Sequence, residues 1–127
     1  MSRKDRDSRE RSDVALPIRL LAVPEGWDGS KELEERILSR ESLHLERIVS
    51  RGHTAPEEGW YDQDHDEWVA LLQGRAVIRF DDGRVLVMEA GDAYLIPAHD
   101  RHKVDRTSSD PPCVWIALHL PAAGSGL

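Results

Sequence analysis

Short β-rich segments separated by turn signals fill the chain from residue 43 to residue 121, and they restrict the possible folds more than any other feature. The segments are SLHLERIVSRG, EWVALLQG, RAVIRF, RVLVME, AYLIP, HKVDRT and CVWIALHL. RAVIRF and RVLVME flank Asp81-Asp82-Gly83, which is typical of a hairpin turn. Six or seven short strands, with turn signals about every 8–12 residues, predict an all-β antiparallel sandwich or barrel.

The residues before this region differ in character. Residues 1–13 contain many charged side chains and no core former. Such a segment cannot bury enough apolar surface to offset its ordering entropy, so we predict a disordered charged tail. Residues 14–42 are predicted to hold an extended segment, because Pro17 and Pro24 disfavour a helix there, followed by one short helix over residues 31–40.

That helix is predicted from its start signal and its apolar stripe. Ser30 is a plausible N-cap, and the residues after it are good helix formers. Leu33, Ile37 and Leu38 would form one narrow apolar stripe on its surface. At the other end of the chain, residues 122–127 are predicted to be a flexible C-terminus after the barrel of residues 43–121.

Composition excludes several classes of partner. The 127 residues suffice for one domain with a modest core, and the net charge is −7. A negative protein lacks the basic face that nucleic acid or an anionic membrane requires, so neither is a predicted partner. No apolar run approaches the roughly 20 residues of a membrane helix. A single cysteine, Cys113, and no secretory signal favour a reducing, cytoplasmic location.

An acidic cluster surrounds one histidine in the stretch GWYDQDHDEWVALLQG, residues 59–74. Acids crowded together without a base must be screened by water or by a cation. Two interpretations therefore stay open, a solvated loop and a metal site. Glu67 favours the site, because it leads directly into an apolar run that is predicted to be buried.

Two motifs resemble those of the cupin superfamily. Members of this superfamily are small double-sheet jelly-roll barrels. The first is Glu67 with Gly74 following after six residues, and the second runs from Gly91 through Pro97 to His102. The resemblance covers roughly residues 43–120 and is closest to small single-domain bacterial cupins. It implies a cupin-like double-stranded jelly-roll barrel, and it implies a homodimer.

The resemblance also implies a metal site. In a typical cupin the ion is held by an HxH pair, the glutamate of the first motif and the histidine of the second. If four residues separate the second histidine position from Glu67, the two histidine positions are Trp60 and Asp62. If three residues separate them, the two positions are Tyr61 and Gln63. In the first register the predicted metal ligands are Asp62, Glu67 and His102. Two carboxylates and one imidazole suit a divalent Zn, Mn, Fe or Ni ion.

His65 is an alternative ligand if its turn folds inward. Outward is favoured, because the neighbouring charges of Asp64 and Asp66 prefer water. Other residues are predicted to line the pocket or to contact the metal ligands without binding the ion. They are Trp60, Tyr61, Gln63, His99 and His119.

Two functions are compatible with these residues. The first is a metal-dependent small-molecule enzyme of the cupin type, with oxygenase-like or isomerase-like chemistry. The alternative is a metal-free, non-catalytic module that binds or senses a small ligand. Both predict a small-molecule partner in the mouth of the barrel.

Overall fold

The computed structural model describes residues 14–124, and every regular element among them is a β-strand. The strands are β1 (Leu33–Arg40), β2 (Leu43–Ser50), β3 (His65–Gln73), β4 (Arg75–Phe80), β5 (Val85–Glu89), β6 (Ala93–Ile96), β7 (His102–Thr107) and β8 (Cys113–Pro121). The all-β prediction is therefore confirmed for this part of the chain. The predicted tail of residues 1–13, and residues 125–127 of the predicted C-terminus, lie outside the described residues.

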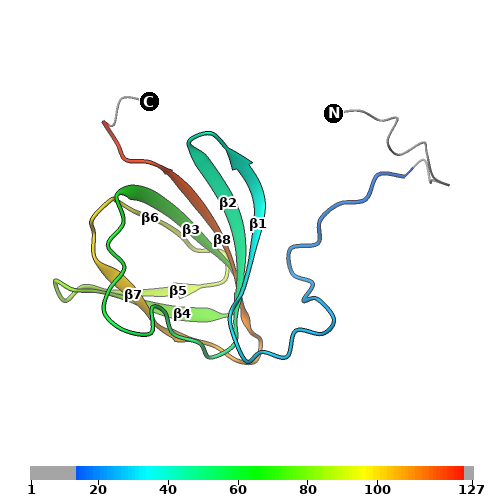
Figure 1. Cartoon of the computed structure of the whole chain (residues 1–127). Coiled ribbons are helices and arrows are strands. Elements are labelled where there is room, and N and C mark those ends of the chain that lie inside the picture. Colours follow the sequence, from blue (N-terminus) through cyan, green and yellow to red (C-terminus); the bar gives the residue numbers. More distant parts are fainter. Residues whose placement is uncertain (1–13, 125–127) are drawn as a thin grey trace.

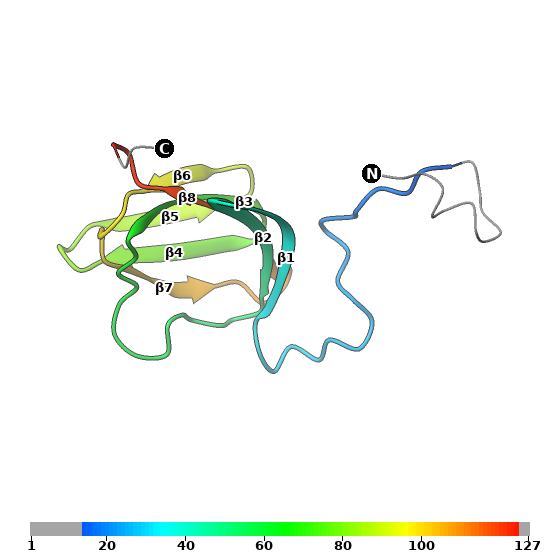
Figure 2. The ribbon, with the colours of Figure 1, turned by 45° about the horizontal axis from the view of Figure 1, so that its top comes forward.

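The strands form two antiparallel sheets that face each other (Figures 1 and 2). One sheet has five strands in the order β1-β2-β8-β3-β6, and the other has three in the order β5-β4-β7. Strands distant in sequence become neighbours within a sheet, such as β2 and β8. The core between them is built from apolar side chains of both sheets, including Leu71, Ile78, Met88, Ile96 and Trp115.

The helix predicted over residues 31–40 is wrong, because residues 33–40 form strand β1. β1 pairs antiparallel with β2, from Leu33 opposite Val49 to Arg40 opposite Leu43. Leu33, Glu35 and Ile37 are half-buried and alternate with exposed residues, which is the period of a strand. The four-residue spacing of Leu33 and Ile37 puts them on one face of either an α-helix or a β-strand. Pairing along β2 overrides the helix propensity here.

Arg47 ties the N-terminal segment to the outside of the barrel. Its side chain lies on β2 and is buried. The guanidinium donates to the carbonyl oxygens of Leu20 and Ala22 at 2.8 and 2.7 Å, and to the Glu35 carboxylate at 2.6 Å. These bonds satisfy a charge that would otherwise be costly to bury.

Gly74 marks the tight connection between β3 and β4. Its φ of 93° lies in the left-handed region, and a Cβ at this position would meet the Cα of Cys113 at 2.9 Å. Only glycine meets both conditions without strain. The first residue of β8 therefore approaches the β3–β4 connection closely at this point. No helix in the described part of the chain is long and apolar enough to span a membrane.

Candidate functional site

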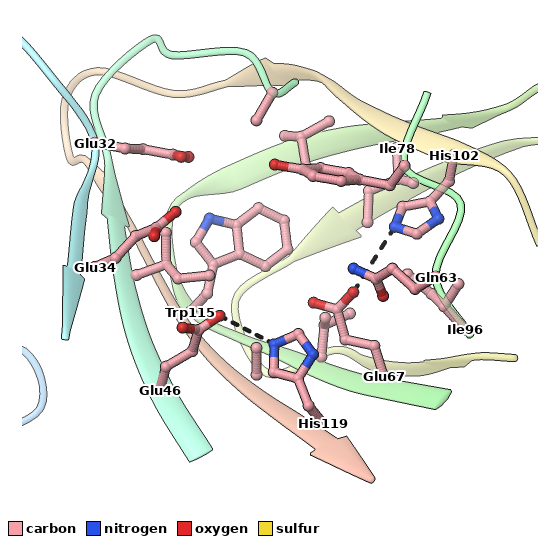
Figure 3. A pocket seen from close by; sticks show the side chains of 16 residues that line it. Glu32, Glu34, Glu46, Gln63, Glu67, Ile78, Ile96, His102, Trp115 and His119 are labelled. Atoms are coloured by element: carbon pink, nitrogen blue, oxygen red, sulfur yellow. Dashed lines mark hydrogen bonds and ion pairs between the residues drawn. The ribbon is translucent and has the colours of Figure 1, made fainter. Parts of the chain in front are cut away.

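A cavity of about 180 Å³ lies between the two sheets (Figure 3). Drug-sized ligands occupy pockets of roughly 300 Å³ and more, so this cavity suits a smaller molecule. One part of its wall is apolar and includes Trp115 and Ile78, and another is polar. The polar lining residues are Glu32, Glu34, Glu46, Tyr61, Gln63, Glu67, His102 and His119.

Glu67 and His102 form a carboxylate–imidazole pair from opposite sheets, in which His102 is buried and Glu67 is 12% exposed. Glu67 lies on β3 and His102 begins β7, and the Glu67 Oε1 to His102 Nε2 distance is 3.8 Å (Figure 3). The other ring nitrogen, Nδ1, donates to the carbonyl of Asp100 at 2.8 Å, which fixes the ring so that Nε2 faces Glu67. Two of the three predicted metal ligands therefore do meet in the interior.

The environment of His102 favours its charged form. Burial lowers the pKa of His102, but the Glu67 carboxylate and the Asp100 carbonyl together outweigh burial and raise it above its usual value. A histidine of this kind can hold a proton at Nε2 near neutral pH and release it to a bound molecule.

Asp62 does not join this pair, and the predicted ligand set of Asp62, Glu67 and His102 does not converge. Asp62 is 48% exposed and bonds to His99 Nδ1 at 2.8 Å. Tyr61 and Gln63 line the cavity instead. In extended backbone, successive side chains point to opposite sides, so when residues 61 and 63 face inward, residue 62 must face outward. The register with three intervening residues is thus the one that reaches the interior.

Tyr61 is anchored beside His102 by a pair of backbone hydrogen bonds of 2.7 and 3.1 Å, and its ring lies 5.5 Å from the imidazole. Burial, together with the charges of Glu32 and Glu34, raises the pKa of Tyr61 to about 12. The phenol therefore stays protonated at neutral pH and has a hydroxyl proton available for hydrogen bonding.

Of the other residues predicted to surround the pocket, His119 lines the cavity, whereas Trp60 and His99 do not. Trp60 packs against the Lys103 ammonium, 4.6 Å from the ring centroid. His99 is exposed, with a φ of 62°. His65 lies at the rim, where its Nε2 is 2.9 Å from His119 Nδ1. It contacts a cavity residue without lining the cavity itself.

Glu46 and His119 form a second carboxylate–imidazole pair. His119 Nε2 donates to Glu46 Oε1 at 3.0 Å (Figure 3). Burial lowers the pKa of His119, but the bond to Glu46 and the charge of Glu67 outweigh it, so the pKa is raised. The same bond lowers the pKa of Glu46. Across the rim, the ring of His44 stacks on that of His119 with centroids 4.4 Å apart.

Glu46 and His44 were not predicted as site residues. Their signal in the sequence is the alternation LHLERI, in which His44, Glu46 and Ile48 share one face of a strand. That alternation does not say which face is inward. Only the pairing of β2 with β8 places this face toward the cavity.

The residues at the family's metal positions do not fit a tightly held transition metal. These positions are Tyr61, Gln63, Glu67 and His102, which offer one carboxylate, one imidazole, one amide and a protonated phenol. Transition metals in proteins are held mainly by imidazole, thiolate and carboxylate ligands. A separate group, His44 with Glu46 and His119, has ligand atoms that all lie within 4.8 Å of one another.

The fold and the cavity define a class, a small antiparallel β-barrel protein with paired acids and imidazoles in its interior. The family model described as "Cupin domain" matches residues 48–119, and the chain belongs to the cupin family. No curated protein is similar enough to this chain to match it.

Three solved structures illustrate the likeness. A Ralstonia eutropha protein described as a "putative mannose-6-phosphate isomerase" is 38% identical, with 85% of this chain and 100% of that chain covered, at a TM-score of 0.76. A cupin superfamily protein from Desulfitobacterium hafniense is 18% identical, with coverages of 87% and 94%, at a TM-score of 0.67. An RmlC-like cupin from Shewanella frigidimarina is 18% identical, with coverages of 81% and 86%, at a TM-score of 0.62. The last two show the fold alone.

Proposed function

We propose that this cupin is an isomerase-like enzyme that moves a proton within a small, uncharged hydroxy-carbonyl compound. The observation that carries the proposal is the Glu67–His102 pair, whose two residues line the cavity with His102 Nε2 and Glu67 Oε1 3.8 Å apart. A carboxylate beside an imidazolium is the combination that removes a proton from carbon while donating one to oxygen.

The step follows from the two protonation states. The Glu67 carboxylate accepts the proton from the carbon next to the substrate carbonyl, and His102 Nε2–H donates its proton to the carbonyl oxygen. The product of this half is an enediol and a neutral pair with the proton on Glu67. The Glu67 proton then moves to the former carbonyl carbon, and the hydroxyl on the other enediol carbon gives its proton to His102 and becomes the new carbonyl, which yields the isomer and restores both residues. Tyr61 and Gln63 orient the substrate hydroxyl groups from the cavity wall.

Charge limits the substrate class. Among the described residues that line the cavity none is a lysine or an arginine, while four are glutamates. A phosphate group would be repelled and would find no bidentate partner. The Ralstonia eutropha protein supports an isomerase reaction by its description, but the phosphate of the sugar named there does not suit this cavity.

The metal-dependent form of this enzyme, with Zn, Mn, Fe or Ni at Glu67 and His102, is a weaker proposal, because Asp62 faces solvent and the neighbouring donors are an amide and a phenol. The non-catalytic alternative, a ligand-binding or sensing module, uses the same cavity. We propose the cytoplasm as its location and a small molecule as its partner, as the sequence predicts.

The test is solvent deuterium exchange. Untagged protein is incubated in D₂O with uncharged aldoses and ketoses and with their phosphate esters, and deuterium beside the carbonyl is measured by mass spectrometry. We expect exchange in the uncharged sugars, and a loss of about 100-fold or more in Glu67→Gln and in His102→Gln. Asp62→Asn is the matched control and keeps the wild-type rate.

The outcomes separate the alternatives. Exchange that persists after treatment with EDTA supports proton transfer by side chains, whereas exchange that is lost and then restored by Zn, Mn, Fe or Ni supports the metal-dependent enzyme. Binding of a sugar without exchange supports the non-catalytic module. Exchange confined to phosphate esters, or unchanged in both active-site variants, contradicts the proposal.

A further inference from the structure

We propose that His44, Glu46 and His119 bind a divalent transition-metal ion at the rim of the cavity. This site is separate from Tyr61 and Gln63 and from the Glu67–His102 pair, and it does not depend on the proposed isomerase function. Its three side chains belong to two neighbouring strands of the five-stranded sheet, β2 and β8.

Strand register brings the three side chains together. His44 lies directly opposite His119 in the β2–β8 pair, and Glu46 lies opposite Ala117. Because residues two apart on a strand share a face, His44, Glu46 and His119 all project from the same face of the sheet. Their ligand atoms lie within 4.8 Å of one another. Both strands are internal to the sheet and paired on each side, which holds the site on rigid elements.

The spacing of two of the ligands already suits an ion. His119 Nε2 and Glu46 Oε1 are 3.0 Å apart. Two ligands of a tetrahedral ion with bonds of about 2.0–2.1 Å lie roughly 3.3 Å apart, so an ion can replace the proton that they share after a small movement. The His44 ring stacks on His119 with an angle of 21° between planes, so it must turn about its side-chain bonds to present a nitrogen to the ion.

A second layer of contacts orients His119. Its other ring nitrogen, Nδ1, is 2.9 Å from His65 Nε2, and His65 Nδ1 is 3.3 Å from Asp64 Oδ1. Metal-binding histidines commonly use their second nitrogen in this way, and the outer partner fixes the tautomer of the ligand. With metal on Nε2, His119 donates from Nδ1 to His65, and His65 donates from Nδ1 to Asp64. We therefore assign His65 as a positioning residue.

The surroundings provide both access and an open position. A surface groove is lined by His44, His65 and His119, and His119 also forms part of the inner cavity wall. An ion can thus enter from solvent, and its fourth position faces water. The charge of Glu34 near Glu46 favours a cation, whereas Arg36, opposite Glu46 on β1, opposes it. Two imidazoles and a carboxylate suit Zn, Ni, Co or Fe(II).

The test uses full-length, untagged protein stripped with EDTA and dialysed against Zn(II), with bound metal measured by mass spectrometry. We expect about one ion per chain, and an affinity at least about tenfold lower in His44→Ala and in Glu46→Gln. His65→Ala is expected to lower affinity by about 10-fold to 100-fold. His53→Ala, which removes a histidine outside the cluster, is the matched control and keeps the wild-type affinity.

A spectroscopic readout identifies the ligands independently of affinity. With one equivalent of Cu(II), electron paramagnetic resonance is expected to show nitrogen couplings from two imidazoles, and from one in His44→Ala. Thermal unfolding without metal confirms that each variant is folded. The proposal is overturned if no stoichiometric uptake occurs, or if uptake survives in His44→Ala and Glu46→Gln but is lost in Glu67→Gln or His102→Gln.

Discussion

Glu67 lies directly opposite His119 across the β3–β8 strand pair, and the same carboxylate meets His102 from the facing sheet. One acid is therefore coupled to two imidazoles that belong to different sheets. Its charge raises the pKa of both histidines. This coupling makes Glu67 the residue whose removal should change the electrostatics of the cavity most.

We predict that Glu67→Gln lowers the pKa of both His102 and His119. The substitution keeps the size of the side chain and removes the negative charge that favours each imidazolium. The measurement is an NMR titration of the imidazole carbon-bound protons. Glu89→Gln, at an exposed position outside the cavity, is the control and should leave both curves unchanged. Unaltered titration of both histidines in Glu67→Gln would exclude the coupling.

Stability should fall as pH rises above neutrality. The folded-state pKa values of His102 and His119 are raised above the unfolded value of 6.5, so their contribution to the free energy of unfolding is complete below pH 6.5 and is lost as pH rises through the folded values. Burial lowers the pKa of His44, which acts in the opposite direction, with stability lost as pH falls. Calorimetry from pH 6 to pH 9 measures the sum of these effects.

The histidine origin of that slope is checked with the double variant His102→Gln/His119→Gln. The variant should be less stable at pH 6 and should show a flatter dependence of melting temperature on pH above 6.5. A slope equal to that of the wild type would assign the effect to other groups.

Leu71→Ala should destabilise the barrel by about 2–5 kcal/mol, because Leu71 is 0% exposed and packs within the core cluster between the sheets. Val85→Ala is a control on β5 in the other sheet, where the side chain is 50% exposed, and should cost less than about 1 kcal/mol. Chemical denaturation gives both values. Equal losses in the two variants would mean that the two sites are equally packed.

The homodimer that the family resemblance implies stays a prediction, and the outer face of the five-stranded sheet is its expected contact. Trp68 and Leu95 are cross-strand partners on β3 and β6, and both are large, apolar and exposed. Such neighbours stabilise an interface by burial. We expect a dimer in sedimentation experiments and a monomer in Trp68→Lys. A monomeric wild type would end this expectation.

Sequence patterns predicted the barrel because turns and apolar alternation are local signals. Asp82 and Gly83 do form the hairpin between β4 and β5, with φ of Gly83 at 101°. The helix over residues 31–40 failed because its apolar spacing is ambiguous. Leu33 and Ile37 are compatible with a helix or a strand, and the strand is selected by antiparallel pairing with β2, which follows after only residues 41 and 42.

The site was predicted less well, because its geometry depends on which alternate residues of the extended segment before Glu67 face the cavity. Glu67 and His102 lie where the motifs indicated, but a register shift of one residue before Glu67 exchanges Asp62 for Tyr61 and Gln63. Glu46 belongs to a strand that carries no family motif. Its face is decided by tertiary pairing, which no local pattern records.

The guanidinium of Arg47 has a practical consequence for anyone shortening this protein. Besides the Glu35 carboxylate, its partners are main-chain oxygens of Leu20 and Ala22, so the extended segment covers a charge that is buried in the barrel wall. A fragment trimmed to the family-matched residues 48–119 would discard Arg47 together with β1, and one beginning at residue 23 would remove its main-chain acceptors and leave it only the Glu35 carboxylate. A minimal barrel that keeps all of these hydrogen bonds therefore has to start upstream of Leu20.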